Sequence, residues 1–212
     1  MKKPPYKIIA FTGRLQHGKT ACAQMLELKG FQRMRFAEPM KDMLVAMGLT
    51  RQQVEVDKEL PVPMLGGKTT RHALQTIGTQ WGRDMIDTNL WSNVTQVRIR
   101  NALVAGKNVV IDDCRFENEA AMLKTMGAVI VRVERDALMP HPTLWTRVLR
   151  FFGLKKEHAS EAGIPDSYVD ITIKNNGSLK DLEARVDAIM TGEYALVSEV
   201  YDAAVELRAS AA

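Results

Sequence analysis

The residues best suited to chemistry form a glycine-rich run, Gly13-Arg14-Leu15-Gln16-His17-Gly18-Lys19-Thr20. It fits the pattern G-x-x-x-x-G-K-[ST] and lies between an apolar segment and a helical pattern. Glycines in such a loop let backbone N–H groups surround a phosphate, and the next helix adds the positive end of its dipole. Lys19 would reach the β- and γ-phosphates of ATP, and the Thr20 hydroxyl would bind Mg²⁺. The predicted ATP contacts are Gly13, Arg14, Gln16, His17, Gly18, Lys19, Thr20 and Ala21.

A second candidate element is the apolar run Val109-Val110-Ile111, which ends in the carboxylates Asp112 and Asp113. An acid at the carboxyl end of a strand beside the loop holds Mg²⁺ directly or through water. Adjacent strand residues face opposite ways, so the choice between the two acids stays open; we assign the metal to Thr20 and Asp113. Arg115 projects to the side of Asp113 in an extended chain, where it would meet a phosphate. A surface ion pair between Asp113 and Arg115 is the alternative.

The apolar pattern predicts the elements that position these residues. Five short, continuously apolar segments indicate buried parallel strands at residues 7–12, 32–36, 108–112, 128–134 and 168–174. Helical patterns lie between them at residues 19–29, 38–47, 70–77, 90–105, 118–126 and 178–190. This alternation predicts an α/β fold in which helices cover both faces of a five-stranded parallel sheet.

Composition limits the class of protein. The 212 residues are 46% hydrophobic, and 29 Lys+Arg against 25 Asp+Glu leave a net charge of +4, typical of one globular domain. The two cysteines make no disulfide framework, which favours a cytoplasmic protein. No apolar run approaches the roughly 18 residues of a membrane span, so we expect no membrane partner. A charge of +4 is weak support for binding a nucleic acid polymer, which we also do not expect.

Five motifs follow one another along the chain: residues 13–20, Phe36-Ala37-Glu38-Pro39-Met40-Lys41, residues 71–84, Asp113-Cys114-Arg115-Phe116-Glu117-Asn118-Glu119, and Asn175-Asn176-Gly177-Ser178-Leu179. In this order, from about Lys7 to Met190, they resemble the deoxynucleoside monophosphate kinases of tailed bacteriophages. The resemblance implies Mg²⁺-dependent transfer of the ATP γ-phosphate to a deoxynucleoside 5′-monophosphate, which supplies DNA precursors. A phage-encoded protein of this kind would act in the host cytoplasm.

The resemblance also implies a three-layer P-loop kinase fold within a single domain. Its core would comprise about residues 7–36, 107–134 and 168–192, with a helical monophosphate-binding insertion at 37–106 and a lid at 135–167. The apolar spacing after Gly192 predicts a C-terminal helix at 193–212, which packs on its own domain or supports a homodimer.

Two nucleotides held end to end require cations from several segments. We assign catalytic roles to Lys19 and Arg115 and, within the lid, to Arg147 and Arg150, which share one face if that stretch is helical. Phe36 and Trp81 would stack on the acceptor base, although core packing is an equal interpretation of Phe36. Asn175 or Asn176 would contact adenine, while their turn could instead cap the next helix through Ser178. The assigned substrate contacts are Phe36, Glu38, Lys41, Arg71, Gln75, Thr79, Gln80, Trp81, Arg83, Asp113 and Arg115.

The chemical group that accepts the transferred phosphate decides whether the enzyme needs a general base. A phosphate with a second pKa of about 6 is already a nucleophile at neutral pH, so a monophosphate kinase needs no general base. One alternative is a kinase of hydroxyl groups, of the nucleoside or dephospho-coenzyme A type, with Glu38 as base. Another is a DNA-linked P-loop ATPase, for which Asp112 followed by Asp113 is only a weak match.

Overall fold

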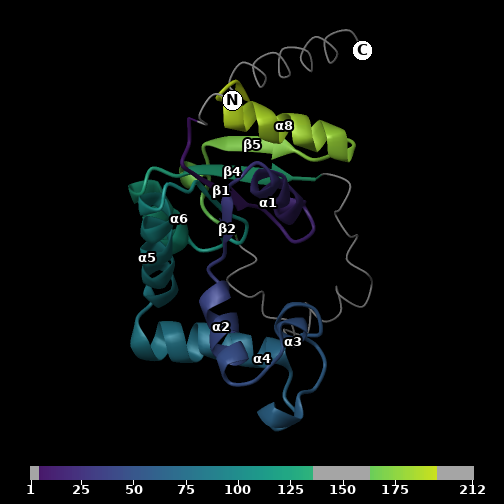
Figure 1. Cartoon of the computed structure of the whole chain (residues 1–212), viewed down its shortest axis with the longest axis vertical. Coiled ribbons are helices and arrows are strands. Elements are labelled where there is room, and N and C mark those ends of the chain that lie inside the picture. The colour runs from purple at the N-terminus through teal and green to yellow at the C-terminus, as the bar shows by residue number, and fades with distance from the viewer. Residues whose placement is uncertain (1–4, 136–162, 195–212) are drawn as a thin grey trace, which may run out of the picture.

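The computed structural model describes residues 5–135 and 163–194. It contains a five-stranded sheet in the order β2-β3-β1-β4-β5, with all neighbouring strands parallel (Figure 1). The strands are β1 (Ile8–Thr12), β2 (Gln32–Met34), β3 (Val109–Ile111), β4 (Val129–Glu134) and β5 (Ile171–Lys174). The α-helices are α1 (Lys19–Leu28), α2 (Glu38–Ala46), α3 (Arg51–Glu55), α4 (Thr70–Gln75), α5 (Leu90–Val104), α6 (Glu117–Thr125) and α8 (Leu179–Thr191). The predicted α/β class and all five strands are confirmed.

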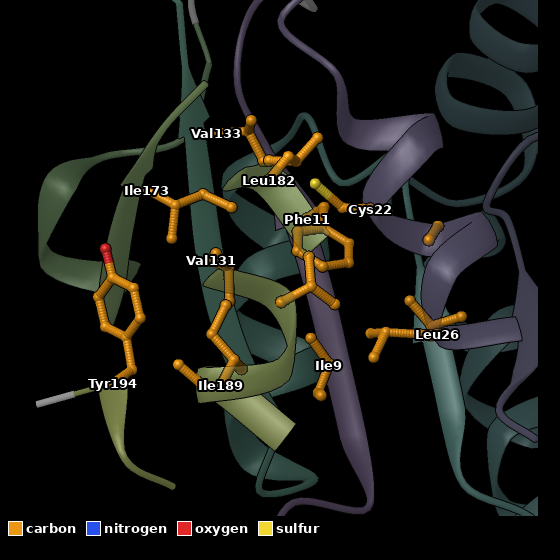
Figure 2. Packing of buried hydrophobic residues seen from close by; sticks show 14 of the residues in the cluster. Ile9, Phe11, Cys22, Leu26, Val131, Val133, Ile173, Leu182, Ile189 and Tyr194 are labelled. Atoms are coloured by element: carbon orange, nitrogen blue, oxygen red, sulfur yellow. The ribbon is translucent and has the colours of Figure 1, made fainter. Parts of the chain in front are cut away.

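Side chains of β1, the central strand, alternate between two apolar cores, one on each face of the sheet. Ile9 and Phe11 pack with Leu26 of α1 and Ile189 of α8 on one face of the sheet (Figure 2). Ile8 and Ala10 face α5 and α6 on the other, in a cluster that includes Ile99, Ile111 and Leu123. Burial on both faces explains why the strands read as continuous apolar runs. This packing fixes the carboxyl ends of β1, β2 and β3 at one edge, where the loop motif and the two acids follow.

The long insertion is helical, as predicted, and α2, α3 and α4 gather at one end of the molecule, away from the sheet (Figure 1). Leu44, Leu49, Val54 and Val62 form a small core there. Sequence patterns missed α3, whose start is marked by a capping box between Thr50 and Gln53. The patterns also predicted that the helix beginning at residue 70 ends at residue 77, whereas a π-helical segment, η2 (Thr76–Ile86), continues from α4.

Glycines explain that missed continuation. Gly78 and Gly82 interrupt the helical pattern, yet both lie where Trp91 approaches the η2 backbone. The Trp91 indole donates a hydrogen bond to the Gly78 carbonyl (2.8 Å), and a Cβ at Gly82 would lie 2.6 Å from the indole. Two 3₁₀ turns, η1 (Pro63–Leu65) and η5 (Asp166–Tyr168), complete the described structure. No helix within the described ranges is long and apolar enough to cross a membrane.

Replacing Gly82 tests this contact. We expect Gly82→Ala to lower the free energy of unfolding by about 1–3 kcal/mol, because the new methyl group overlaps the buried Trp91 ring. Gly78→Ala is the matched control, since its methyl group would meet only the flexible end of Met40. Urea denaturation of both variants gives the comparison, and an equal cost at the two positions would contradict the prediction.

Candidate active site

The glycine-rich loop runs from the end of β1 to the start of α1 and lies against the ends of β4 and β5. Gly13 has a φ of +131°, and a Cβ there would collide with the carbonyl oxygen of Val133. Gly18 has a φ of +106°, and a Cβ there would collide with the amide of Asn175. Both positions therefore require glycine for backbone conformation and for space.

Lys19 is largely buried at the first position of α1. Its ammonium donates hydrogen bonds to the carbonyl oxygens of Gly13 and Arg14, both at 2.7 Å. Burial and, to a smaller extent, the positive charge of Arg115 lower the pKa of Lys19 to about 8, although the charges of Asp112 and Asp113 oppose the change. An anionic phosphate in the loop would favour the protonated form of this amine.

Asp112 is the acid that meets the loop. The Thr20 hydroxyl donates to Asp112 Oδ2 (3.0 Å), Arg35 Nε donates to Oδ1 (3.1 Å), and Arg33 also donates to this carboxylate. Burial raises the pKa of Asp112, but the Arg33 hydrogen bond and the charges of Arg35 and Arg33 outweigh it and lower the pKa. An ionised carboxylate therefore lies beside the Thr20 hydroxyl.

Asp113, which we assigned to the metal together with Thr20, makes no hydrogen bond to Thr20 among the described residues, and that assignment stays a prediction. Its carboxylate accepts hydrogen bonds from the backbone N–H groups of Phe36 (2.9 Å) and Ala37 (3.1 Å), just past β2. Burial raises its pKa, although these two hydrogen bonds oppose the rise. Thr20 and Asp112 supply a hydroxyl and a carboxylate oxygen, the donors that suit Mg²⁺ when nucleotide phosphates provide other ligands. The residues present therefore fit the implied ion.

A cleft of about 400 Å³ opens over these residues. Lys19 and Thr20 line one part, and the insertion contributes Lys41, Glu55 and Lys58. The cations in its wall are Lys19, Arg35, Lys41, Lys58 and Arg115. The structure thus brings together the predicted residues Lys19, Lys41, Asp113 and Arg115, with Gln16, Gly18 and Thr20 of the loop.

Two of these cations were missed by sequence reasoning. Arg35 directly follows β2, and that position at the carboxyl end of a strand was a usable signal. Lys58 lies between α3 and η1, where no motif marks it. Burial lowers the pKa of Lys58, and the nearby charge of Lys41 lowers it further.

Other predicted substrate residues lie outside the wall of this cleft. Phe36 is only 3% exposed within the core, so core packing is the correct interpretation and stacking on a base is not. Arg71 is exposed and pairs with Glu59. Glu38 pairs with Arg51 (2.9 Å) beside a different groove, between β2 and α5. The remaining predicted acceptor contacts, Gln75, Thr79, Gln80 and Trp81, lie on α4 and η2, where the Trp81 ring is 6.1 Å from that of Trp91.

Asn175 supports the loop from the end of β5. Its side-chain amide donates to the His17 carbonyl (2.9 Å), while His17 Nδ1 lies 3.2 Å from the Val133 carbonyl. Ser178 caps α8 in a capping box with Asp181, so the predicted cap is confirmed. Contact of Asn175 or Asn176 with adenine stays a prediction. Arg147 and Arg150, most of the predicted lid and most of the C-terminal helix lie outside the described residues.

Glu119 ties the insertion to the backbone of Arg115. Its buried carboxylate accepts hydrogen bonds from the N–H groups of Arg115 (2.9 Å) and Phe116 (3.1 Å) and from Arg83 Nη2 (3.0 Å). The Arg83 guanidinium also lies 3.8 Å from the centre of the Phe116 ring. Arg83 therefore has a clear structural role. Burial raises the pKa of Glu119 to about 7, against an ordinary value of 4.5.

This raised pKa predicts a pH effect on stability. The folded protein holds the Glu119 proton more tightly than the unfolded chain, so stability present below pH 4.5 is lost as pH rises to about 7. Relative to Glu119→Gln, the wild type should lose up to roughly 3 kcal/mol across that window. Denaturant unfolding from pH 5 to pH 8 measures this difference. Glu117→Gln, an exposed site on the same helix, should show no such trend, and a flat Glu119 comparison would contradict the assignment.

Comparison with known proteins identifies a family that this chain resembles. A family model described as deoxynucleotide monophosphate kinase matches residues 66–186, more than half of the chain. A mimivirus protein of that name, from Acanthamoeba polyphaga mimivirus, is 26% identical over 195 residues, covering 84% of this chain and 93% of its own length. The deoxynucleoside-5′-monophosphate kinase of Escherichia phage T5 is 29% identical over 105 residues, covering 50% of this chain and 38% of its own length. A dephospho-CoA kinase structure from Campylobacter jejuni shares 15% identity at a TM-score of 0.47, covering 88% of this chain and 98% of its own.

Proposed function

The chain belongs to the deoxynucleotide monophosphate kinase family, and from this we propose that it transfers the γ-phosphate of ATP to a deoxynucleoside 5′-monophosphate. One observation carries the assignment: a single cleft joins the phosphate-binding loop to cations of the insertion. Lys19 and the loop amides would hold the donor phosphates. Arg35, Lys41, Lys58 and Arg115 would receive the acceptor phosphate.

Catalysis by these residues is positioning and charge neutralisation. Mg²⁺, when bound with the nucleotide at Thr20 and Asp112, supplies charge neutralisation at the donor phosphates. Lys19 and Arg115 would stabilise the charge that develops between the two phosphates. The acceptor phosphate attacks without a base because it is already close to doubly charged. The pairing of Glu38 with Arg51, outside the cleft, gives no support to a hydroxyl kinase that uses Glu38 as its base.

Product analysis tests this function. We expect wild-type protein with ATP and Mg²⁺ to form diphosphates from a panel of deoxynucleoside monophosphates. Lys19→Met should lower kcat about 10²–10³-fold, the usual cost of removing a group that stabilises transition-state charge. Lys29→Met is the control, because Lys29 closes the same helix and pairs with Asp187 at 2.6 Å, away from the loop. ATP hydrolysis stimulated by DNA, with no labelled mononucleotide product, would overturn the proposal.

The two adjacent acids give a separate prediction about Mg²⁺. Asp112→Asn should raise the Mg²⁺ concentration that gives half-maximal activity, because it removes the charge beside Thr20. Asp113→Asn should leave that concentration near the wild-type value, since Asp113 is bound to the amides of Phe36 and Ala37. Mg²⁺ titrations at saturating nucleotides make the comparison. The opposite order would identify Asp113 as the metal-side acid.

A further inference from the structure

Glu55 is an acid in the part of the cleft where cations gather. It ends α3, and Lys41 Nζ donates hydrogen bonds to both of its carboxylate oxygens, at 2.8 and 2.9 Å. Arg35 Nη1 lies 3.5 Å from Glu55 Oε2. The charge of Lys58 also acts on this carboxylate. One carboxylate thus faces three of the five cations in the wall of the cleft.

The burial of Lys41 explains why a carboxylate is needed there. Lys41 is only 4% exposed, and a buried ammonium without a counter-charge is strongly unfavourable. Burial raises the pKa of Glu55, but the hydrogen bond and charge of Lys41 and the charge of Arg35 outweigh it and lower the pKa. Glu55 is therefore the ionised partner that holds these cations together.

Charge at this point is only partly balanced. Lys41 and Lys58 each bring one positive charge, Lys41 also lies 3.8 Å from Glu38 Oε2, and Arg35 is shared between Glu55 and Asp112. No described residue accepts a hydrogen bond from the Lys58 amine. A phosphate with nearly two negative charges and three terminal oxygens satisfies such a group better than one carboxylate.

We propose that Glu55 is an internal counter-anion that occupies the place of the acceptor phosphate among Lys41, Lys58 and Arg35 and gives up these cations when the phosphate binds. The inference rests on the proposed function, since it assumes that this part of the cleft receives the acceptor. The affinity for the acceptor then depends on how much more strongly these cations pair with the phosphate than with Glu55. The exchange favours a doubly charged phosphate over a singly charged anion, which makes Glu55 a determinant of specificity.

Neutralising Glu55 should destabilise the free protein and strengthen its binding of phosphate. Glu55→Gln should lower the unfolding temperature of the free protein, because buried Lys41 loses its hydrogen-bonded counter-charge and keeps only Glu38, whose Oε2 lies 3.8 Å away. Inorganic phosphate should then raise that temperature more in the variant than in the wild type. The acceptor KM should fall about three- to tenfold, since the competing carboxylate is gone. Glu59→Gln is the matched control, because Glu59 lies four residues away, is exposed and pairs with Arg71 outside the cleft.

The outcomes separate this proposal from the function on which it rests. An acceptor KM that rises or stays unchanged in Glu55→Gln, while diphosphate is still formed, would overturn the counter-anion role and leave the kinase function standing. If neither protein forms diphosphate, the proposed function fails. The phosphate-dependent unfolding temperatures then still decide whether Glu55 competes with an anion. If inorganic phosphate raises the unfolding temperature equally in wild type, Glu55→Gln and Glu59→Gln, the counter-anion role of Glu55 is overturned.

Discussion

The carboxylate of Asp112 is the interaction on which the site depends. It lies at the end of β3 and accepts hydrogen bonds from Thr20, after β1, and from Arg33 and Arg35, in and after β2. Three neighbouring parallel strands are thereby joined at their carboxyl ends by one buried charge. Because a buried carboxylate is tolerated only when it is paired, the arginines and the loop hydroxyl hold one another in place.

Other residues of the cleft are also held in place by polar partners within the protein. Lys19 is held by loop carbonyls, Lys41 by Glu55, and the Arg115 backbone by Glu119. In each case a protein group holds the residue in position before any nucleotide is present. At Lys19 and Arg115, such preorganisation reduces the reorganisation needed when phosphates bind, which is how a site of fixed charges accelerates phosphoryl transfer.

The sequence predicted the features that local pattern determines. Burial on both faces produces apolar runs, so five strands were found, and the loop motif located Lys19 and Thr20. The sequence did not show that Asp112 accepts a hydrogen bond from Thr20, while Asp113 accepts from the backbone N–H groups of Phe36 and Ala37, which are far away in the sequence. The burial of Phe36, the pairing of Arg83 with Glu119 and the position of Lys58 likewise arise only from tertiary packing.

Among the residues that the structure describes, two ion pairs connect the insertion to the core, and they differ in their position relative to the cleft. Arg83 and Glu119 meet beside the Phe116 ring, and neither side chain lines the cleft. Arg35 and Glu55 meet inside the cleft, where an anion of higher charge can displace the carboxylate. The pair of Arg83 and Glu119 therefore keeps the insertion attached to the core, whereas a phosphate can replace Glu55 as the partner of Arg35. This division lets the acceptor side respond to its ligand without releasing the backbone of Arg115.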